Sequence, residues 1–254
     1  MTTMLMAANW KMHKTRQEAR TTVEDLAARI AEKLPGDREV LIIPPFTALQ
    51  PVYEAVEGSP GFAVGGQNFY PDKQGAYTGE VSPGMLLDCG CSYALAGHSE
   101  RRHVMGEDDA FVGRKVLFGL DKGLRMILCV GETLEQREQD RVQEVLQAQL
   151  RAGLADVDQD IDPSRLAVAY EPVWAIGTGK VAGPEEIAQA HAFVRQQLQD
   201  LLPGPGPSIR ILYGGSVKPD NCARIIGLDN VEGVLVGGAS LNAASFADIV
   251  LAGI

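Results

Sequence analysis

Short apolar runs alternate with longer amphipathic stretches along the whole chain. Eight runs have the length and composition of buried strands, at residues 5–9, 40–43, 62–66, 93–96, 125–130, 166–170, 210–213 and 233–236. Helical patterns separate them, most clearly over 16–34, 108–120, 133–150, 185–202 and 219–226, with 243–252 closing the chain. Pro184 before two glutamates is a typical helix start. Strands that alternate with helices predict parallel βαβ units.

The number of these units predicts the fold. Eight βα units in 254 residues match the usual size of an α/β protein built as a (β/α)8 barrel, so we predict one domain over 1–254. A doubly wound open sheet is the alternative, but it usually carries a glycine-rich turn after its first strand. Here Trp10, Lys11, Met12 and His13 follow that strand.

Charge and cysteine content narrow the function classes. The 23 Lys and Arg residues against 33 Asp and Glu give a net charge of −10, which argues against nucleic-acid and membrane partners but permits a small anionic ligand. No apolar run approaches the ~18 residues of a membrane span. Four cysteines are too few for a disulfide scaffold, and Cys89 and Cys91 lack a matching pair for zinc. We therefore expect a cytoplasmic protein without a metal site.

Ionisable residues stand where the predicted strands end, which is where barrels carry their chemistry. Side chains alternate between the two faces of a strand. Asn9 therefore shares a face with Leu5 and Ala7, and His98 shares one with Ala94 and Ala96. Glu171 likewise shares a face with Ala167 and Ala169. If these faces point inward, Asn9, His98 and Glu171 meet above the barrel floor, with Lys11 continuing the first strand. A single His or Glu more often has a structural hydrogen-bonding role. A cation, an imidazole and a carboxylate at three strand ends favour a catalytic site.

Glycine pairs follow the last two predicted strands. The backbones of Gly214-Gly215 and Gly237-Gly238 can approach a ligand closely because they carry no side chain. A helix beginning near Ala239 would point free N–H groups at the same place. Two ordinary tight turns are the alternative, but adjacent pairs favour an anion site.

The segment after the sixth predicted strand is apolar in its middle and flanked by residues that control backbone freedom. It consists of Pro172, Val173, Trp174, Ala175, Ile176, Gly177, Thr178, Gly179 and Lys180. Gly177 and Gly179 can absorb large backbone changes, whereas Pro172 stiffens the entry. This pattern is typical of a lid that closes over a substrate and excludes water. A surface loop is the alternative.

Several motifs together resemble the triosephosphate isomerase family, whose fold is the TIM barrel. They are Asn9-Trp10-Lys11, Gly97-His98-Ser99-Glu100-Arg101-Arg102, Cys129-Val130-Gly131-Glu132, the segment from Tyr170 to Lys180, Tyr213-Gly214-Gly215-Ser216-Val217 and Gly237-Gly238-Ala239-Ser240. They occur in the family's order over residues 8–240. Ala8 and Gly183 depart from the family pattern, and neither is a chemical position.

The resemblance implies an isomerase of triose phosphates in glycolysis and gluconeogenesis that needs no cofactor. Glu171 would be the base, and His98, beside a short helix starting at Ser99, would be the electrophile. Lys11 and Asn9 would contact substrate, and Glu100 would hold Lys11 in position. The phosphate would bind to Gly177, Ser216, Gly237 and Gly238.

The long loop over 67–82 bears on oligomerisation. It contains Phe69, Tyr70 and Tyr77, which would be awkward in water. In the family this loop inserts into a partner subunit, so the resemblance implies a homodimer with Thr78 as a dimer contact. A flexible surface loop is the alternative.

Two other functions remain open from the sequence. One is a Schiff-base aldolase on the same barrel, with Lys11 or Lys180 as the nucleophile. The other is a phosphate-binding or assembly protein without catalysis.

Overall fold

Each predicted apolar run forms a strand in the computed structural model, which describes residues 3–176 and 182–253. Six strands have the predicted bounds, and the first two begin one and two residues earlier. The strands are β1 Met4–Asn9, β2 Arg38–Ile43, β3 Phe62–Gly66, β4 Tyr93–Ala96, β5 Arg125–Val130, β6 Leu166–Tyr170, β7 Arg210–Tyr213 and β8 Gly233–Val236. Nearly all strand residues are buried on both faces of the sheet, so short continuous apolar runs located the strands.

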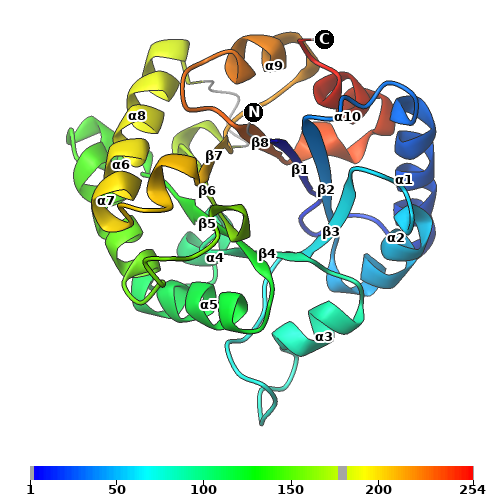
Figure 1. Ribbon diagram of the computed structural model, residues 1–254, viewed down its shortest axis with the longest axis horizontal. Helices are drawn as coiled ribbons and strands as arrows, with labels where there is room; N and C mark the ends of the chain where they lie inside the picture. Colours follow the sequence, from blue (N-terminus) through cyan, green and yellow to red (C-terminus); the bar gives the residue numbers. More distant parts are fainter. Residues whose placement is uncertain (1–2, 177–181, 254) are drawn as a thin grey trace.

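The strands close into a barrel. All neighbours are parallel, and β1 pairs with both β2 and β8 (Figure 1). The closed barrel confirms the (β/α)8 prediction and rules out the open sheet. The helices lie outside it: α1 Arg16–Ile30, α2 Leu49–Val56, α3 Pro83–Asp88, α4 Ser99–His103, α5 Asp109–Asp121, α6 Leu134–Glu138, α7 Val142–Leu154, α8 Pro184–Leu201, α9 Pro219–Ile226 and α10 Ala243–Val250.

Some helix bounds differ from the prediction. The helix expected over 133–150 is two helices, α6 and α7, because Asp140 has a φ of 55°, outside the right-handed helical region. Thr133 caps α6 through a reciprocal pair of hydrogen bonds with Gln136. The helix α1 ends at Ile30, four residues earlier than expected. The helix expected near Ala239 is the short 3-10 turn η5 (Gly238–Leu241).

Two apolar layers sit on opposite faces of the strands. The inner layer fills the barrel and comes from strands alone, with Leu5, Ala7, Leu41, Ile43, Tyr93, Leu95, Ile127, Cys129, Ala167, Ala169, Leu212 and Leu235. The outer layer joins the other strand faces to the helices. The barrel is therefore a packed core, and a ligand can enter only at an end.

The predicted orientation of β4 is wrong. Ala94 and Ala96 belong to the outer layer, whereas Tyr93 and Leu95 point into the barrel. His98 still reaches the mouth because Gly97, with a φ of 74°, interrupts the strand geometry between Ala96 and His98. For β1 and β6 the predicted inward faces are confirmed.

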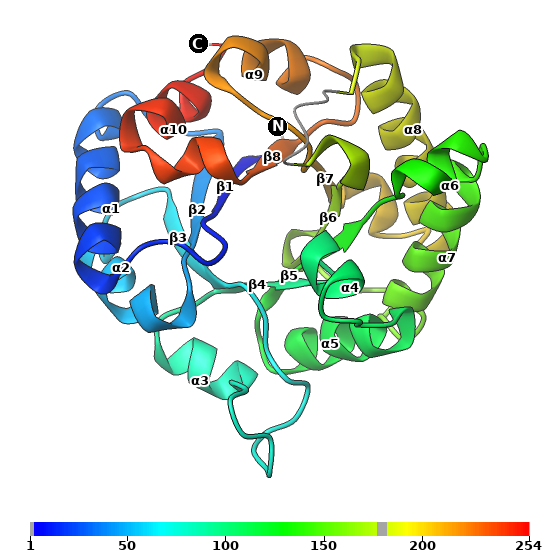
Figure 2. The same cartoon turned by 180° about the vertical axis from the view of Figure 1, so that it is seen from behind.

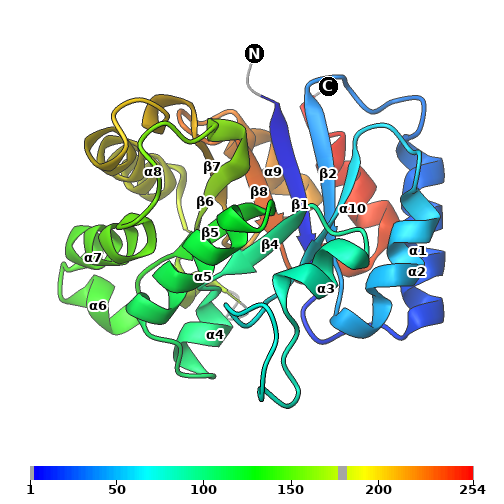
Figure 3. The same ribbon diagram turned by 60° about the horizontal axis from the view of Figure 1, so that its bottom comes forward.

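The two ends of the barrel carry different features. At the amino-terminal end, Tyr93 donates a hydrogen bond to Glu39 (2.8 Å) and accepts one from Arg210 (2.8 Å), so the polar groups pair with one another. At the carboxyl-terminal end lie α4 and the loop over 67–82 (Figures 2 and 3).

No helix within the described ranges is long and apolar enough to cross a membrane.

A histidine is buried behind the barrel wall on α8. His191 is 0% exposed, its Nδ1 lies 2.8 Å from the carbonyl oxygen of Asn230, and its Nε2 has no partner among the described residues. Its ring lies edge-on to Tyr170. Burial lowers the pKa of His191 to about 4, although its contact with the Asn230 carbonyl opposes that shift.

We expect His191 to make folding acid-sensitive. Its folded pKa lies below the unfolded value of 6.5, so the unfolded chain binds the proton first as pH falls. Stability should therefore decline between about pH 6.5 and 4, with His191 contributing a loss of ~3 kcal/mol at the acid end. Denaturant unfolding across that range measures it. The unfolding free energy of His191→Gln, which can still donate a hydrogen bond to Asn230, should decline less than that of the wild type by this amount. An equal decline in both proteins would contradict the assignment.

Candidate active site

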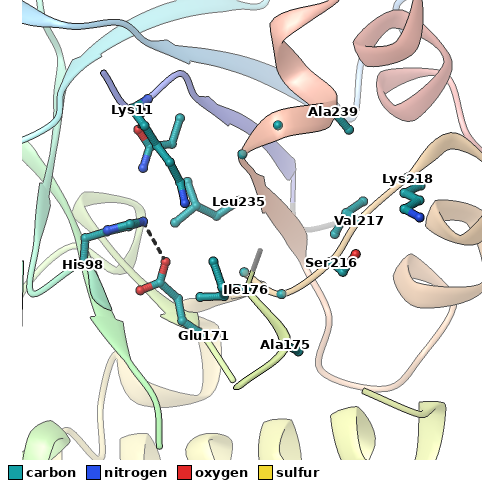
Figure 4. A pocket seen from close by; sticks show the side chains of 15 residues that line it. Lys11, His98, Glu171, Ala175, Ile176, Ser216, Val217, Lys218, Leu235 and Ala239 are labelled. Carbon is teal, nitrogen blue, oxygen red and sulfur yellow. Dashed lines mark hydrogen bonds and ion pairs between the residues drawn. The ribbon is translucent and has the colours of Figure 1, made fainter. Parts of the chain in front are cut away.

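A cavity of about 270 Å³ opens at the carboxyl-terminal mouth of the barrel (Figure 4). It gathers residues from β1, β4, β6, β7 and β8 or the loops after them. They are Asn9, Lys11, His98, Glu171, Ala175, Ile176, Gly214, Gly215, Ser216, Val217, Lys218, Leu235, Gly237, Gly238 and Ala239. The structure thus brings together the residues that the strand ends predicted, although it does not test their chemical roles.

Glu171 and His98 face each other within this cavity. Glu171 Oε1 lies 3.2 Å from His98 Nε2, and Glu171 Oε2 accepts a 2.9 Å hydrogen bond from the backbone N–H of Ser99. Glu171 is 2% and His98 5% exposed. A carboxylate removed from water in this way depends on such donors for its stability.

The environment of His98 selects one tautomer of its ring. Nδ1 accepts a hydrogen bond from the backbone N–H of Glu100 (3.3 Å), an arrangement that caps α4. A neutral ring that accepts at Nδ1 carries its proton on Nε2. The proton therefore points toward Glu171 and the cavity, where it can be donated to a ligand oxygen.

Lys11 is placed by its backbone as well as by its side chain. It has a φ of 51°, which is uncommon for a residue with a side chain, and its N–H donates to Asn9 Oδ1 (3.0 Å). Its Nζ lies 2.8 Å from Glu100 Oε1, so the two side chains form an ion pair. Burial alone would raise the pKa of Glu100, but the hydrogen bond from Lys11 and the charge interaction with His98 outweigh it and lower that pKa.

Two glycines make room for Glu171. A Cβ on Gly131 would lie 1.8 Å from the carbonyl oxygen of Glu171, and a Cβ on Gly214 would lie 2.8 Å from Glu171 Cγ. Any side chain at Gly131 would force the end of β6 to move. The buried amide of Gln149 fixes Gly131 further by bonding both its N–H and its carbonyl group (2.7 and 3.2 Å).

The glycines after β7 and β8 form the opposite wall, together with Ser216. Gly237 has a ψ of −110° with a φ of −88°, a combination outside the regions that other residues favour. A Cβ on Gly237 would lie 3.3 Å from Lys11 Cε, so the bare backbone sits close to that cation. The turn η5 begins directly after Gly237, and the first N–H groups of such a turn have no hydrogen-bond partner within it. This wall suits an anion.

The root of the predicted lid is anchored on Glu132. Its Oε1 accepts hydrogen bonds from Trp174 Nε1 (2.7 Å), Tyr170 Oη (3.2 Å) and Arg137 (3.3 Å). The guanidinium of Arg137 also lies over the Trp174 ring. Ala175 and Ile176 line the cavity. The predicted lid and phosphate residues Gly177, Thr178, Gly179 and Lys180 lie outside the described residues.

Several supporting residues escaped the sequence analysis. Gln67 donates from Nε2 to the carbonyl oxygens of Lys11 (2.8 Å) and Ile43 (3.1 Å), so it fixes the loop that carries Lys11. Leu235 forms part of the cavity wall, and Lys218 lies at its edge (Figure 4). The position of Gln67 just after a strand was the only sequence signal for it.

Metal binding finds no support in the described parts of the chain. No three His, Cys, Asp or Glu side chains there lie close enough to hold an ion together. Cys89, Cys91, Cys129 and Cys222 are all free thiols. Burial raises the pKa of Cys91 to about 12 and that of Cys222 to about 11, so neither is an activated nucleophile.

The loop over 67–82 projects beyond the barrel (Figure 1). Tyr70 and Tyr77 stack with ring centroids 3.9 Å apart, and Thr78 is exposed on the same loop. The loop is thus internally ordered and presents its outer surface away from the chain's own core.

Comparisons with known proteins agree on one family. The model of the family "Triosephosphate isomerase" matches residues 4–253. A triosephosphate isomerase of Nitratidesulfovibrio vulgaris strain Miyazaki F is 62% identical over 98% of this chain and 99% of its own length. Those of Oleidesulfovibrio alaskensis (98% of this chain, 99% of its own) and Chloroflexus aurantiacus (97% of each) are 60% and 49% identical.

Replacing Gln67 should show how much the Lys11 loop depends on it. In Gln67→Glu a carboxylate would face two carbonyl oxygens without a proton to donate, so we expect a loss of about 1–3 kcal/mol in unfolding free energy at neutral pH. Denaturant unfolding measures this loss. Gln17→Glu, on the exposed face of α1, is the matched control and should change stability by less than ~0.5 kcal/mol. Equal stability of both variants would contradict the role of Gln67.

Proposed function

The chain belongs to the triosephosphate isomerase family, and we propose that its cavity interconverts dihydroxyacetone phosphate and D-glyceraldehyde 3-phosphate through an enediolate. This isomerisation is a step of glycolysis and gluconeogenesis. It moves hydrogen between neighbouring carbons and between their oxygens, so oxidation and reduction balance within the substrate. The reaction therefore needs a base, a proton donor and a phosphate anchor, but no cofactor.

The placement of Glu171 beside His98 is the observation that carries the proposal. A carboxylate can remove the proton from carbon, and a neutral imidazole with its proton on Nε2 can donate to the adjacent oxygen. They lie 3.2 Å apart, so one small substrate bound at this point would be within reach of both groups. In the described state the two groups bind each other, so we infer that Glu171 must move away from Ser99 and His98 when substrate binds.

Lys11 and Asn9 complete the reacting end. The ammonium group of Lys11 reaches the cavity while paired with Glu100, and it can stabilise negative charge that develops on the substrate oxygens. Asn9 supports it by accepting the backbone N–H of Lys11. The same ion pair argues against the Schiff-base alternative, because the amine would have to leave Glu100 before it could attack a carbonyl carbon.

The phosphate group belongs on the opposite wall. Ser216 offers a hydroxyl group, and Gly237 and Gly238 offer backbone approach. We assign Gly177 to this set from the family motif alone. Phosphate binding there can supply the energy that closes the segment from Pro172 to Lys180 over the cavity, where exclusion of water strengthens Glu171 as a base.

We further propose that the working enzyme is a homodimer. The described surface leaves large apolar side chains open in the segments after β1, β3 and β4, among them Met12 (93% exposed), Val104 at the end of α4 (73%) and Met85 on α3 (54%). The loop with Tyr77 and Thr78 projects from the same end (Figure 3). A second copy carries the same exposed apolar side chains and the same loop. Pairing of the two copies would remove the apolar side chains of both from water and would place Thr78 in the contact.

Two further assignments follow. We propose that residues 1–254 form one domain, since the first and last strands pair with each other within a single barrel. A cytoplasmic location is supported by the four unpaired thiols and by a substrate of central metabolism.

Shortening the base tests the catalytic assignment. Glu171→Asp withdraws the carboxylate by about one carbon–carbon bond, so kcat in a coupled triose phosphate assay without added metal should fall ~10²-fold or more. KM should change by only a few fold, since phosphate binding is untouched. Glu185→Asp, at an exposed position of α8, is the control and should keep wild-type kcat. Unchanged turnover in Glu171→Asp would remove Glu171 from the reaction, and an inactive wild-type enzyme would refute the function.

A single charge on α3 tests the dimer. The wild-type protein should sediment with twice the mass of the chain, whereas Met85→Glu should shift it toward the monomer because a carboxylate would be buried at the interface. Leu134→Glu introduces the same charge at an exposed leucine on α6 and should leave the mass unchanged. A monomeric wild-type protein at micromolar concentration would contradict the proposal.

A further inference from the structure

The turn that points His98 into the cavity departs from the geometry of its own strand. The β4 ladder ends at Ala96, which pairs with Leu128 of β5. Continued alternation would put His98 on the outer face with Ala94 and Ala96. Gly97 interrupts the alternation with its φ of 74°, so the direction of His98 depends on one peptide beyond the ladder.

That peptide is held by an arginine. Arg102 Nε donates to the carbonyl oxygen of Gly97 (2.7 Å), and Arg102 Nη2 donates to the carbonyl oxygen of Cys129 (3.1 Å). Nη1 pairs with Asp109 at the start of α5. The side chain is 7% exposed and is absent from the cavity lining, so it holds the turn from behind.

The two carbonyl groups explain why a guanidinium is required. Gly97 follows β4 and Cys129 lies near the end of β5, and two carbonyl oxygens cannot bond each other. A planar fork with several donors joins them and reaches Asp109 at the same time, in effect extending the β4–β5 connection past Ala96. A lysine ammonium carries the same charge but cannot reproduce this fork.

We propose that Arg102 is a positioning residue that fixes the direction of the His98 imidazole for proton donation. The proposal rests on the isomerase function and on the role of His98 in it. It predicts that loss of the fork slows the chemical step while leaving phosphate binding intact, because Ser216, Gly237 and Gly238 come from the opposite wall.

A second buried arginine provides a matched control. Arg195 on α8 likewise holds two backbone carbonyl groups, those of Gly206 and Ile209 (2.7 Å each), and pairs with Glu232. None of these residues lines the cavity. Arg195→Lys therefore reports what loss of a buried fork does to the fold alone.

The experiment compares Arg102→Lys, Arg102→Ala and Arg195→Lys with the wild type. For Arg102→Lys we expect kcat to fall ~10²-fold, with KM and competitive inhibition by inorganic phosphate changed less than threefold. Arg195→Lys should lower Tm comparably but keep kcat within twofold. Guanidinium at non-denaturing concentration should restore part of the kcat of Arg102→Ala, whereas equal ionic strength from sodium chloride should not.

Nitrogen NMR of the imidazoles gives a readout that a purely structural role would not move. The chain has four histidines, so the spectrum is assignable. His98 should be a single Nε2-protonated tautomer in the wild type and a mixture in Arg102→Lys, while His191 should be unchanged. Wild-type kcat in both folded Arg102 variants would overturn the proposal. An equal loss of kcat in Arg195→Lys and Arg102→Lys would also overturn it. Full activity in Arg102→Lys, with a loss of kcat only in Arg102→Ala, would do the same. An inactive wild type would instead refute the isomerase function.

Discussion

Closure of the barrel is the constraint on which the site depends. Parallel strands all end on the same side, and closure through β1 and β8 brings those ends around one mouth. Glu171 and His98, separated by 73 positions in the sequence, follow β6 and β4, which both pair with β5, and lie 3.2 Å apart. Closure adds Lys11 after β1 and Gly237 after β8 to the same mouth. The apolar inner layer, with Leu235 below the mouth, closes the floor so that these polar groups face a cavity and not a channel.

The contacts that hold the buried carboxylate of Glu171 compete with the contacts that a substrate needs. It is 2% exposed and is stabilised by the Ser99 N–H and the His98 ring. These contacts satisfy the charge of Glu171, but they also occupy the proton that His98 would donate. Substrate has to replace both contacts, and the energy for that exchange can come from its phosphate on the opposite wall. The distance between the two walls of the cavity therefore matters for this exchange of contacts.

The sequence predicted the strands, the closed barrel and the residues of the mouth, because burial patterns and strand ends are local signals. It failed where an unusual backbone conformation or a distant partner decides the structure. The direction of His98 depends on the φ of Gly97, which strand alternation does not contain. The break between α6 and α7 depends on the left-handed conformation of Asp140, in a stretch whose helical pattern is continuous. Gln67 and Arg102 act through backbone carbonyl groups far along the chain, and no motif spacing encodes such partners.

The acidic character of the chain shows how local the anion site must be. With a net charge of −10, the long-range field opposes the approach of a phosphorylated substrate, and Lys11 shares its charge with Glu100. Short-range donors, chiefly the backbone around Gly237 and the hydroxyl group of Ser216, can add attraction at close range. Such donors are neutral, so they add no charge that would oppose the release of product. They also have fixed directions, so a phosphate that satisfies them would be oriented when it binds, and in the proposed reaction the carbon to be deprotonated would then be directed toward Glu171.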